Sequence, residues 1–167
     1  MSDRVFAWIR IGGPLTDDQM TAVLGAAATD GAEDENGDEP SLGTIKEAAS
    51  AGRPLYLQCN DAAGGNLPAI TDLCRRENIP YDLGCEGYPG SFEAAVESFR
   101  PPAKCPTAYD ASRLRSFSLE GLAHFDAAVN EPAITVTTLR SLPPGLSIEK
   151  LLSHYFPPEL PPVSDAD

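Results

Sequence analysis

The cysteines and histidines are the residues from which a thiol enzyme would be built. Cys59 or Cys85 would need an imidazole beside it to generate a thiolate, and only His124 and His154 could supply one. No recognisable catalytic motif joins these residues, so the sequence favours a protein that is not an enzyme and has no catalytic residues. No C-x-x-C pair occurs, and we expect buried free thiols at Cys59, Cys74, Cys85 and Cys105.

Metal ligation is the second chemistry that the residue types allow. Asp30, Asp34, Asn36 and Asp38 are oxygen ligands in one short segment, as in a calcium loop. The order D-x-D-x-D-G followed by a terminal Glu is absent, and the chain has no recognisable helical pair of ligands with a third nearby. We therefore expect no metal and no cofactor.

A glycine-containing loop after the second predicted strand could bind a small ligand. Ligands of open α/β sheets lie beyond the carboxyl ends of strands, and helix N-termini attract anions. The loop lacks the G-x-G-x-x-G spacing, and Asp61 would repel a phosphate, so an ordinary turn remains the alternative. The candidate ligand loop consists of Asn60, Asp61, Gly64, Gly65 and Asn66.

The acidic balance of the chain predicts the charge of a partner. The net charge is −13, from 25 acidic and 12 basic residues, which argues against direct binding of nucleic acid and favours a basic protein surface. Solubility alone is the alternative explanation. The acids concentrate in a predicted solvated loop at residues 30–40, called the acidic loop below. Its candidate partner-binding residues are Asp30, Glu33, Asp34, Glu35, Asp38 and Glu39.

The elements that would position these residues begin with a strand over residues 5–11, where apolar side chains alternate. Thr16 and Gln19 form a capping box, and the apolar spacing after them predicts a helix that ends near Thr29. A second helix begins after Ser41 and stops at Gly52, a residue suited to a left-handed C-terminal position.

A strand, helix and strand follow in quick order. Residues 55–59 and 81–85 are the two short apolar strands, and the helix between them has Asn66 as its predicted cap and Asn78 as its end. A crossover of this length predicts parallel pairing in a βαβ unit. Residues 87–106 are compatible with either a helix or an edge strand.

Further elements are predicted towards the C-terminus: helices at residues 118–130 and 147–155 and a strand at residues 134–139. The fold class is α/β or α+β, with a small mixed sheet of about four strands flanked by helices. Residues 1–156 form a single domain, and residues 157–167 are a Pro-rich flexible tail. The chain has neither a membrane span of roughly 18 apolar residues nor a secretory signal, which predicts a cytoplasmic protein.

Residues 52–81 (GRPLYLQCNDAAGGNLPAITDLCRRENIPY) form a strand, a glycine turn and a helix, with Asp82 next. This stretch resembles uncharacterised proteins carried by bacterial plasmids and phages. The resemblance implies an accessory role in a mobile element and carries no catalytic residues. Together with the acidity, it predicts an inhibitor of a host nucleic-acid-binding defence protein, of the anti-CRISPR or antirestriction type. The alternative is a small-molecule-binding or catalytic domain that uses the loop at residues 60–66.

Overall fold

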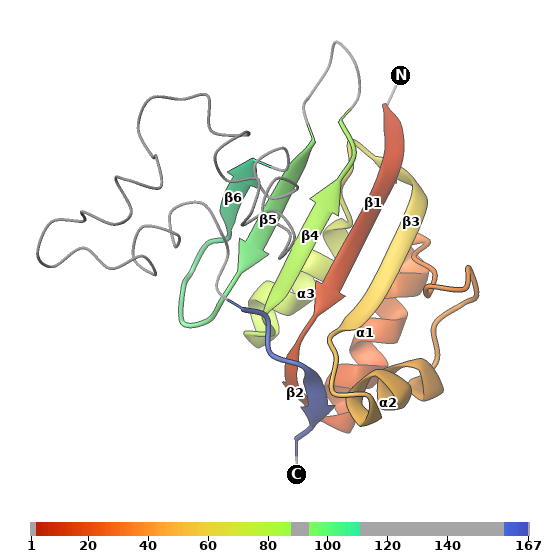
Figure 1. Cartoon of the computed structure of the whole chain (residues 1–167), viewed down its shortest axis with the longest axis vertical. Helices are drawn as coiled ribbons and strands as arrows, with labels where there is room; N and C mark the ends of the chain where they lie inside the picture. Colours follow the sequence, from red (N-terminus) through yellow and green to blue (C-terminus); the bar gives the residue numbers. More distant parts are fainter. Residues whose placement is uncertain (1–2, 88–93, 111–158, 167) are drawn as a thin grey trace, which may run out of the picture.

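A five-stranded antiparallel sheet is the centre of the molecule. The computed structural model describes residues 3–87, 94–110 and 159–166. The strands of the sheet are β1 (Arg4–Ile11), β3 (Leu55–Ala63), β4 (Tyr81–Cys85), β5 (Ala95–Phe99) and β6 (Thr107–Asp110). They lie in the order β3-β1-β4-β5-β6, and all neighbours pair antiparallel (Figure 1).

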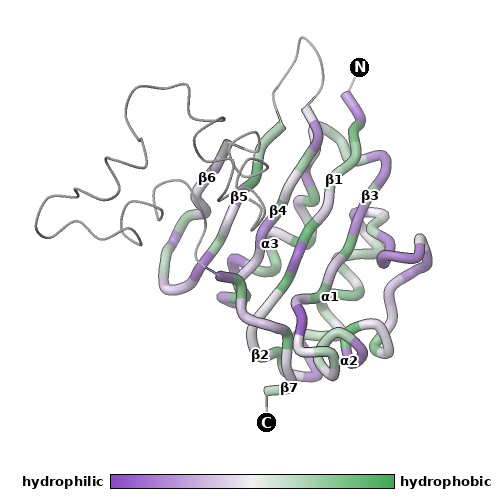
Figure 2. Tube along the Cα trace, in the orientation of Figure 1, coloured by the Kyte–Doolittle hydropathy of each residue, from purple (hydrophilic) through white to green (hydrophobic). Residues whose placement is uncertain are grey.

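The predicted alternation of β1 is confirmed. Every second side chain, from Val5 to Ile11, is buried, while Phe6 and Trp8 on the other face are half-buried. Figure 2 shows the same change between hydrophobic and hydrophilic residues along the strands of the sheet. Successive side chains of a strand point to opposite faces, so one face of the sheet carries the core.

Among the described residues, three helices accompany the sheet: α1 (Asp17–Asp30), α2 (Leu42–Ser50) and α3 (Pro68–Glu77). Helices α1 and α3 cover one face, and no described helix lies on the opposite face (Figure 1). The predicted capping box is confirmed, because Thr16 Oγ1 accepts from the Gln19 backbone N–H (3.2 Å) and Gln19 Oε1 accepts from that of Thr16 (3.0 Å). Asn78 ends α3 in the left-handed conformation, as expected.

The parallel pairing predicted for the βαβ unit is wrong. Strands β3 and β4 run in the same direction, but β1 lies between them and pairs antiparallel with both. Ala7 and Ile9 of β1 are fully buried, and the centre of the sheet is where a strand can satisfy the backbone groups on both of its edges. The fold is therefore α+β, which was one of the two predicted classes.

The ambiguous stretch at residues 87–106 contains a strand. β5 pairs with β4 from Ala95 opposite Cys85 to Phe99 opposite Tyr81. Phe99 is buried on the helix-covered face, where its ring centroid lies 5.6 Å from that of Tyr81. This aromatic pair extends the core from β4 to β5.

The C-terminal segment is packed against the domain, in contrast to the flexible tail expected from residue 157. β7 (Val163–Asp165) pairs in parallel with β2 (Gly13–Leu15) in a separate two-stranded sheet. Leu160 and Val163 are buried, and the Gly13 N–H donates to the Pro162 carbonyl (3.0 Å). Two apolar side chains and a ladder of backbone bonds therefore hold a segment whose composition favours disorder.

Three predicted elements, at residues 118–130, 134–139 and 147–155, lie outside the described residues. Within the described ranges, no helix combines the length and the apolar character that a membrane span requires.

Candidate functional site

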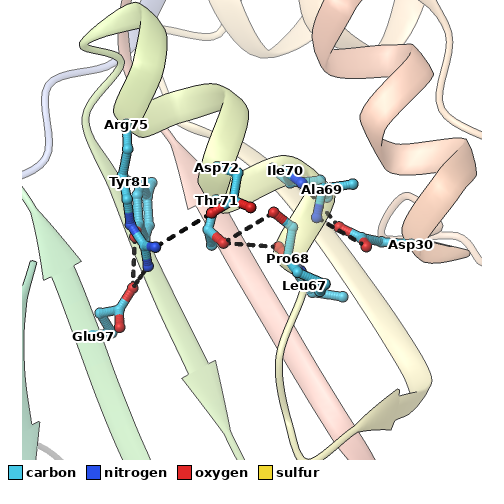
Figure 3. Close-up of polar contacts among 10 residues, drawn as sticks. All are labelled: Asp30, Leu67, Pro68, Ala69, Ile70, Thr71, Asp72, Arg75, Tyr81 and Glu97. Carbon is cyan, nitrogen blue, oxygen red and sulfur yellow. Dashed lines mark hydrogen bonds and ion pairs between the residues drawn. The ribbon is translucent and has the colours of Figure 1, made fainter.

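Asp30 of the acidic loop belongs to α1 and serves the fold. Its carboxylate accepts hydrogen bonds from the backbone N–H groups of Ala69 (3.1 Å) and Ile70 (2.9 Å), in the first turn of α3 (Figure 3). Asn66, the predicted cap of this helix, instead donates from its side chain to the Gly64 carbonyl (3.2 Å). A carboxylate at a helix N-terminus satisfies backbone donors and complements the helix dipole, so Asp30 replaces the local cap.

Asp34 and Glu33 fix the backbone of the acidic loop. Asp34 is only 8% exposed, and its Oδ1 accepts from the backbone N–H groups of Asn36 (2.8 Å) and Asp38 (3.1 Å). Glu33 and Gln58 exchange two backbone hydrogen bonds of 2.7 and 2.8 Å, which attach the loop to the edge strand β3. The segment is a loop, as expected, but hydrogen bonds fix its backbone at Asp34 and at Glu33.

The remaining candidate acids, Glu35, Asp38 and Glu39, are exposed on this fixed backbone. Figure 2 shows hydrophilic residues along the loop that follows α1. Glu35 forms an ion pair with Arg53 (2.9 Å), in which both side chains keep much of their exposure. Such a pair contributes little to stability and leaves Glu35 accessible. The acidic loop therefore presents three carboxylates to the solvent.

The charge of the acidic loop affects its surroundings. Glu35 and Glu47 of α2 line a hollow of about 20 Å³ beside the loop, which has room for about one water molecule. The pKa of Tyr56 on β3 is raised mainly by burial and, to a smaller extent, by the negative charge of Glu35. The hollow is too small for a ligand, so any binding at this place involves the outer surface of the loop.

The structure places the candidate ligand loop in a tight turn. Asn60 and Asp61 belong to β3, and Asp61 forms an exposed ion pair with Arg4 (2.6 Å). Gly64 and Gly65 have φ values of 60° and 71°, in the left-handed region that favours glycine. The predicted turn is present here, and none of its residues lines the hollow beside the acidic loop.

A polar cluster of Arg75, Tyr81 and Glu97 was missed by the sequence analysis. The Tyr81 hydroxyl donates to Glu97 Oε1 (2.5 Å), and Arg75 donates to that hydroxyl (3.0 Å) and to the same carboxylate (2.8 Å) (Figure 3). The pKa of Tyr81 is raised mainly by burial and, to a smaller extent, by the hydrogen bond to Glu97. The hydroxyl therefore stays protonated at neutral pH and ties α3 to β4 and β5.

A second missed cluster lies on the face opposite α1 and α3. Asp82 of β4 is buried and accepts hydrogen bonds from Ser98 and from Arg100 (2.8 Å). Arg10 of β1 lies opposite Asp82 in the sheet. The sequence signal was one charged residue, Asp82, in an otherwise uncharged strand, which indicates that its side chain needs a partner but does not identify that partner.

The thiols fit a structural role. Cys59 and Cys74 are buried as predicted, whereas Cys85 is half-buried and Cys105 is exposed, and all four are free. Burial raises the pKa of Cys74 to about 12.

Among the described residues, no three ligand-type side chains gather in a way that could hold a metal ion. His124 and His154 lie outside these residues, so the absence of a thiol–imidazole pair remains a prediction.

Comparison of the chain with protein-family models, with curated proteins and with solved structures found no match. The resemblance of residues 52–81 to plasmid- and phage-borne proteins therefore remains an expectation. The acidic loop, with its fixed backbone and exposed carboxylates, is the candidate binding surface of the described residues.

Proposed function

We propose that the protein acts by binding, with the acidic loop placed against a basic surface of a partner protein. The observation that carries this proposal is the fixed backbone of the loop. The bonds of Asp34 and the bridge between Glu33 and Gln58 hold the chain in one conformation while Glu35, Asp38 and Glu39 are exposed. A preorganised surface loses less conformational entropy when it binds.

The charge of the chain supports a basic partner. Like charges held close together repel one another, and a net charge of −13 adds to this repulsion. A basic partner would relieve it, and the attraction would speed association and make it sensitive to salt. The negative field would also keep nucleic acid away from this surface.

Proteins that bind nucleic acid carry basic surfaces shaped for phosphates, and an array of carboxylates can occupy such a surface. The resemblance of residues 52–81 to plasmid- and phage-borne accessory proteins favours a partner in host defence. The protein would then inhibit by competing with nucleic acid for the same site. No bond is made or broken in this mechanism.

The test compares two triple variants with equal loss of charge. Glu35→Gln, Asp38→Asn and Glu39→Gln neutralise the acidic loop. Asp17→Asn, Asp72→Asn and Glu86→Gln remove three exposed charges elsewhere. The unmodified chain is used to capture partners from a bacterial lysate, and each captured protein is titrated in the presence of a labelled oligonucleotide.

The proposal expects the unmodified chain and the control variant to displace the oligonucleotide with similar affinity, and the loop variant to lose at least tenfold. The affinity should fall as salt rises from 50 to 300 mM. The fall should be steeper when more charged groups of the two proteins are in contact. If the two variants weakened binding equally, the effect would come from net charge alone, and the acidic loop would have no specific role. Partners that bind without releasing the oligonucleotide would contradict inhibition by competition.

A further inference from the structure

A hollow of about 300 Å³ lies on the sheet face opposite α1 and α3, where the C-terminal segment passes over the sheet. Arg10, Asp82 and Glu159 are its charged lining residues, and Pro54, Leu160 and Pro162 add an apolar wall. This volume is at the lower end of the range for small-molecule sites. No residue of the acidic loop lines this hollow, although Gly52 and Pro54 flank Arg53, the ion-pair partner of Glu35.

Arg10 and Asp82 occupy directly opposite positions on β1 and β4. The Cβ atoms of such pairs are about 5 Å apart, close enough for an ion pair. Asp82 nevertheless bonds to Ser98 and Arg100, on its other side. Within the described part of the chain, nothing forms a hydrogen bond or an ion pair with the guanidinium of Arg10, which is exposed to the hollow.

The two oxygens of Asp82 differ in their contacts. Both Ser98 and Arg100 donate to Oδ1, and Oδ2 receives no hydrogen bond from a described residue. The Asp82 side chain is 8% exposed. Every fully buried side-chain oxygen or nitrogen of the described residues has a hydrogen-bond partner, so an oxygen without a partner must be open to solvent. Oδ2 is therefore an accessible acceptor in a mostly buried carboxylate, next to the unpaired guanidinium.

We propose that this hollow binds a free α-amino acid with an apolar side chain. The ligand carboxylate would pair with Arg10, which offers a fork of N–H donors. The ligand ammonium would bind to Asp82 Oδ2, with Glu159 at the rim. The side chain would lie along Leu160 and the prolines. A free amino acid carries both charges on one carbon, which suits a guanidinium and a carboxylate on adjacent strands.

The charges of the lining discriminate against other small ligands. A phosphate or a dicarboxylate would meet Asp82 and Glu159, which repel anions. A simple amine would leave Arg10 without a partner. An N-acylated or amidated amino acid retains only one of the two charges, so a peptide interior does not satisfy the hollow.

The experiment titrates the full chain calorimetrically with L-leucine, L-valine, L-phenylalanine, L-proline and L-methionine, and with the N-acetyl and amide forms of each. We expect saturable binding of at least one free amino acid and at least tenfold weaker binding of both of its blocked forms. Backbone amide shifts on addition of the ligand should concentrate at Gly52, Glu159 and Leu160.

Variants locate the site. Arg10→Gln should weaken binding at least tenfold and Glu159→Gln several-fold, whereas Arg76→Gln, an exposed change on α3, should leave the affinity unchanged. Asp82 is buried, so Glu159→Gln tests the ammonium side without risk to the core. The triple variant of the acidic loop should bind the amino acid normally, which separates this proposal from the one on partner binding.

Three results would overturn the inference. The first is the absence of saturable binding by all five free amino acids. The second is a blocked form that binds as tightly as its parent. The third is an Arg10→Gln variant that binds with the affinity of the unmodified chain.

Discussion

The carboxylate of Asp30 accepts a hydrogen bond of 2.9 Å from the backbone N–H of Ile70, which joins the end of α1 to the beginning of α3. Leu67, at the N-cap of α3, offers no side-chain acceptor. The donors of this helix end are thus satisfied by a residue from another helix. An acid that sequence analysis assigns to partner binding is therefore a structural cap.

Replacement of Asp30 by Ala should destabilise the protein by about 1–2 kcal/mol, because two backbone donors of α3 would lose their acceptor. Urea unfolding followed by circular dichroism measures the change. Asp38→Ala removes a carboxylate from the neighbouring loop, where only the backbone N–H and carbonyl of Asp38 bond to Asp34, and should cost less than about 0.5 kcal/mol. Equal effects of the two changes would refute the capping role.

The raised pKa of Tyr81 predicts a loss of stability in alkali. The folded protein holds this proton more tightly than the unfolded chain does, so the unfolded state ionises first as the pH rises. The stabilisation is complete below about pH 10, the ordinary pKa of tyrosine, and declines above it. Urea midpoints measured from pH 8 to pH 11 should fall at the upper end of this range.

Tyr81→Phe separates this group from the others that titrate in alkali. The variant should lose about 1–2 kcal/mol at pH 7, because Arg75 and Glu97 lose a shared hydroxyl. Its midpoint should fall less steeply above pH 10 than that of the unmodified chain. Cys74, whose pKa is raised to about 12, and Tyr56, whose pKa is also raised, contribute to the alkaline decline in both proteins, so some slope should remain. Identical slopes would show that Tyr81 does not cause the decline.

Gly84 lies under the ring of Trp8, the single tryptophan of the chain. A Cβ at this position would come within 2.3 Å of two ring carbons of Trp8, so the ring must move. Gly84→Ala should therefore cost about 1–3 kcal/mol and shift the emission of the tryptophan towards that of an exposed indole. Gly25→Ala is the control, since nothing lies near its Cβ position in α1. It should leave the emission unchanged and raise the stability by up to about 1 kcal/mol, because alanine favours a helix more than glycine does.

The four thiols should react at different rates with a thiol reagent at pH 8. Cys105 is exposed and should react first, and half-buried Cys85 should follow. Cys59 and Cys74 are buried, so their labelling should require opening of the structure and should speed up in urea. Mass spectrometry of labelled peptides identifies the order. Early labelling of Cys74 would contradict the packing of α3 on the sheet.

Local signals in the sequence were sufficient for most of the described elements. The capping box of Thr16 and Gln19 and the left-handed position of Asn78 depend on residues within one turn, so the structure confirms them. The alternation in β1 likewise depends only on neighbouring positions. The acidic loop was found by composition, although its fixed backbone depends on the contact between Glu33 and Gln58.

Contacts between distant residues were not predictable in this way. The order of strands was missed because the β3, α3 and β4 segments contain no signal that β1 lies between them. Arg10 and Asp82 become neighbours only through that order, so the hollow beside them had no signature in the sequence. Asp30 was assigned to a loop because its bond to Ile70 joins residues forty positions apart.

The pairing of β2 with β7 has a consequence for how the molecule is assembled. Gly13 and Val163 pair although nearly the whole length of the chain separates them. Closing such a long loop costs entropy before the contacts that stabilise it are made, so this pairing should form late in folding. The antiparallel sheet can form while the C-terminal segment is still being synthesised. We therefore expect the hollow over Arg10, which needs Glu159 and Leu160 for one wall, to be completed last.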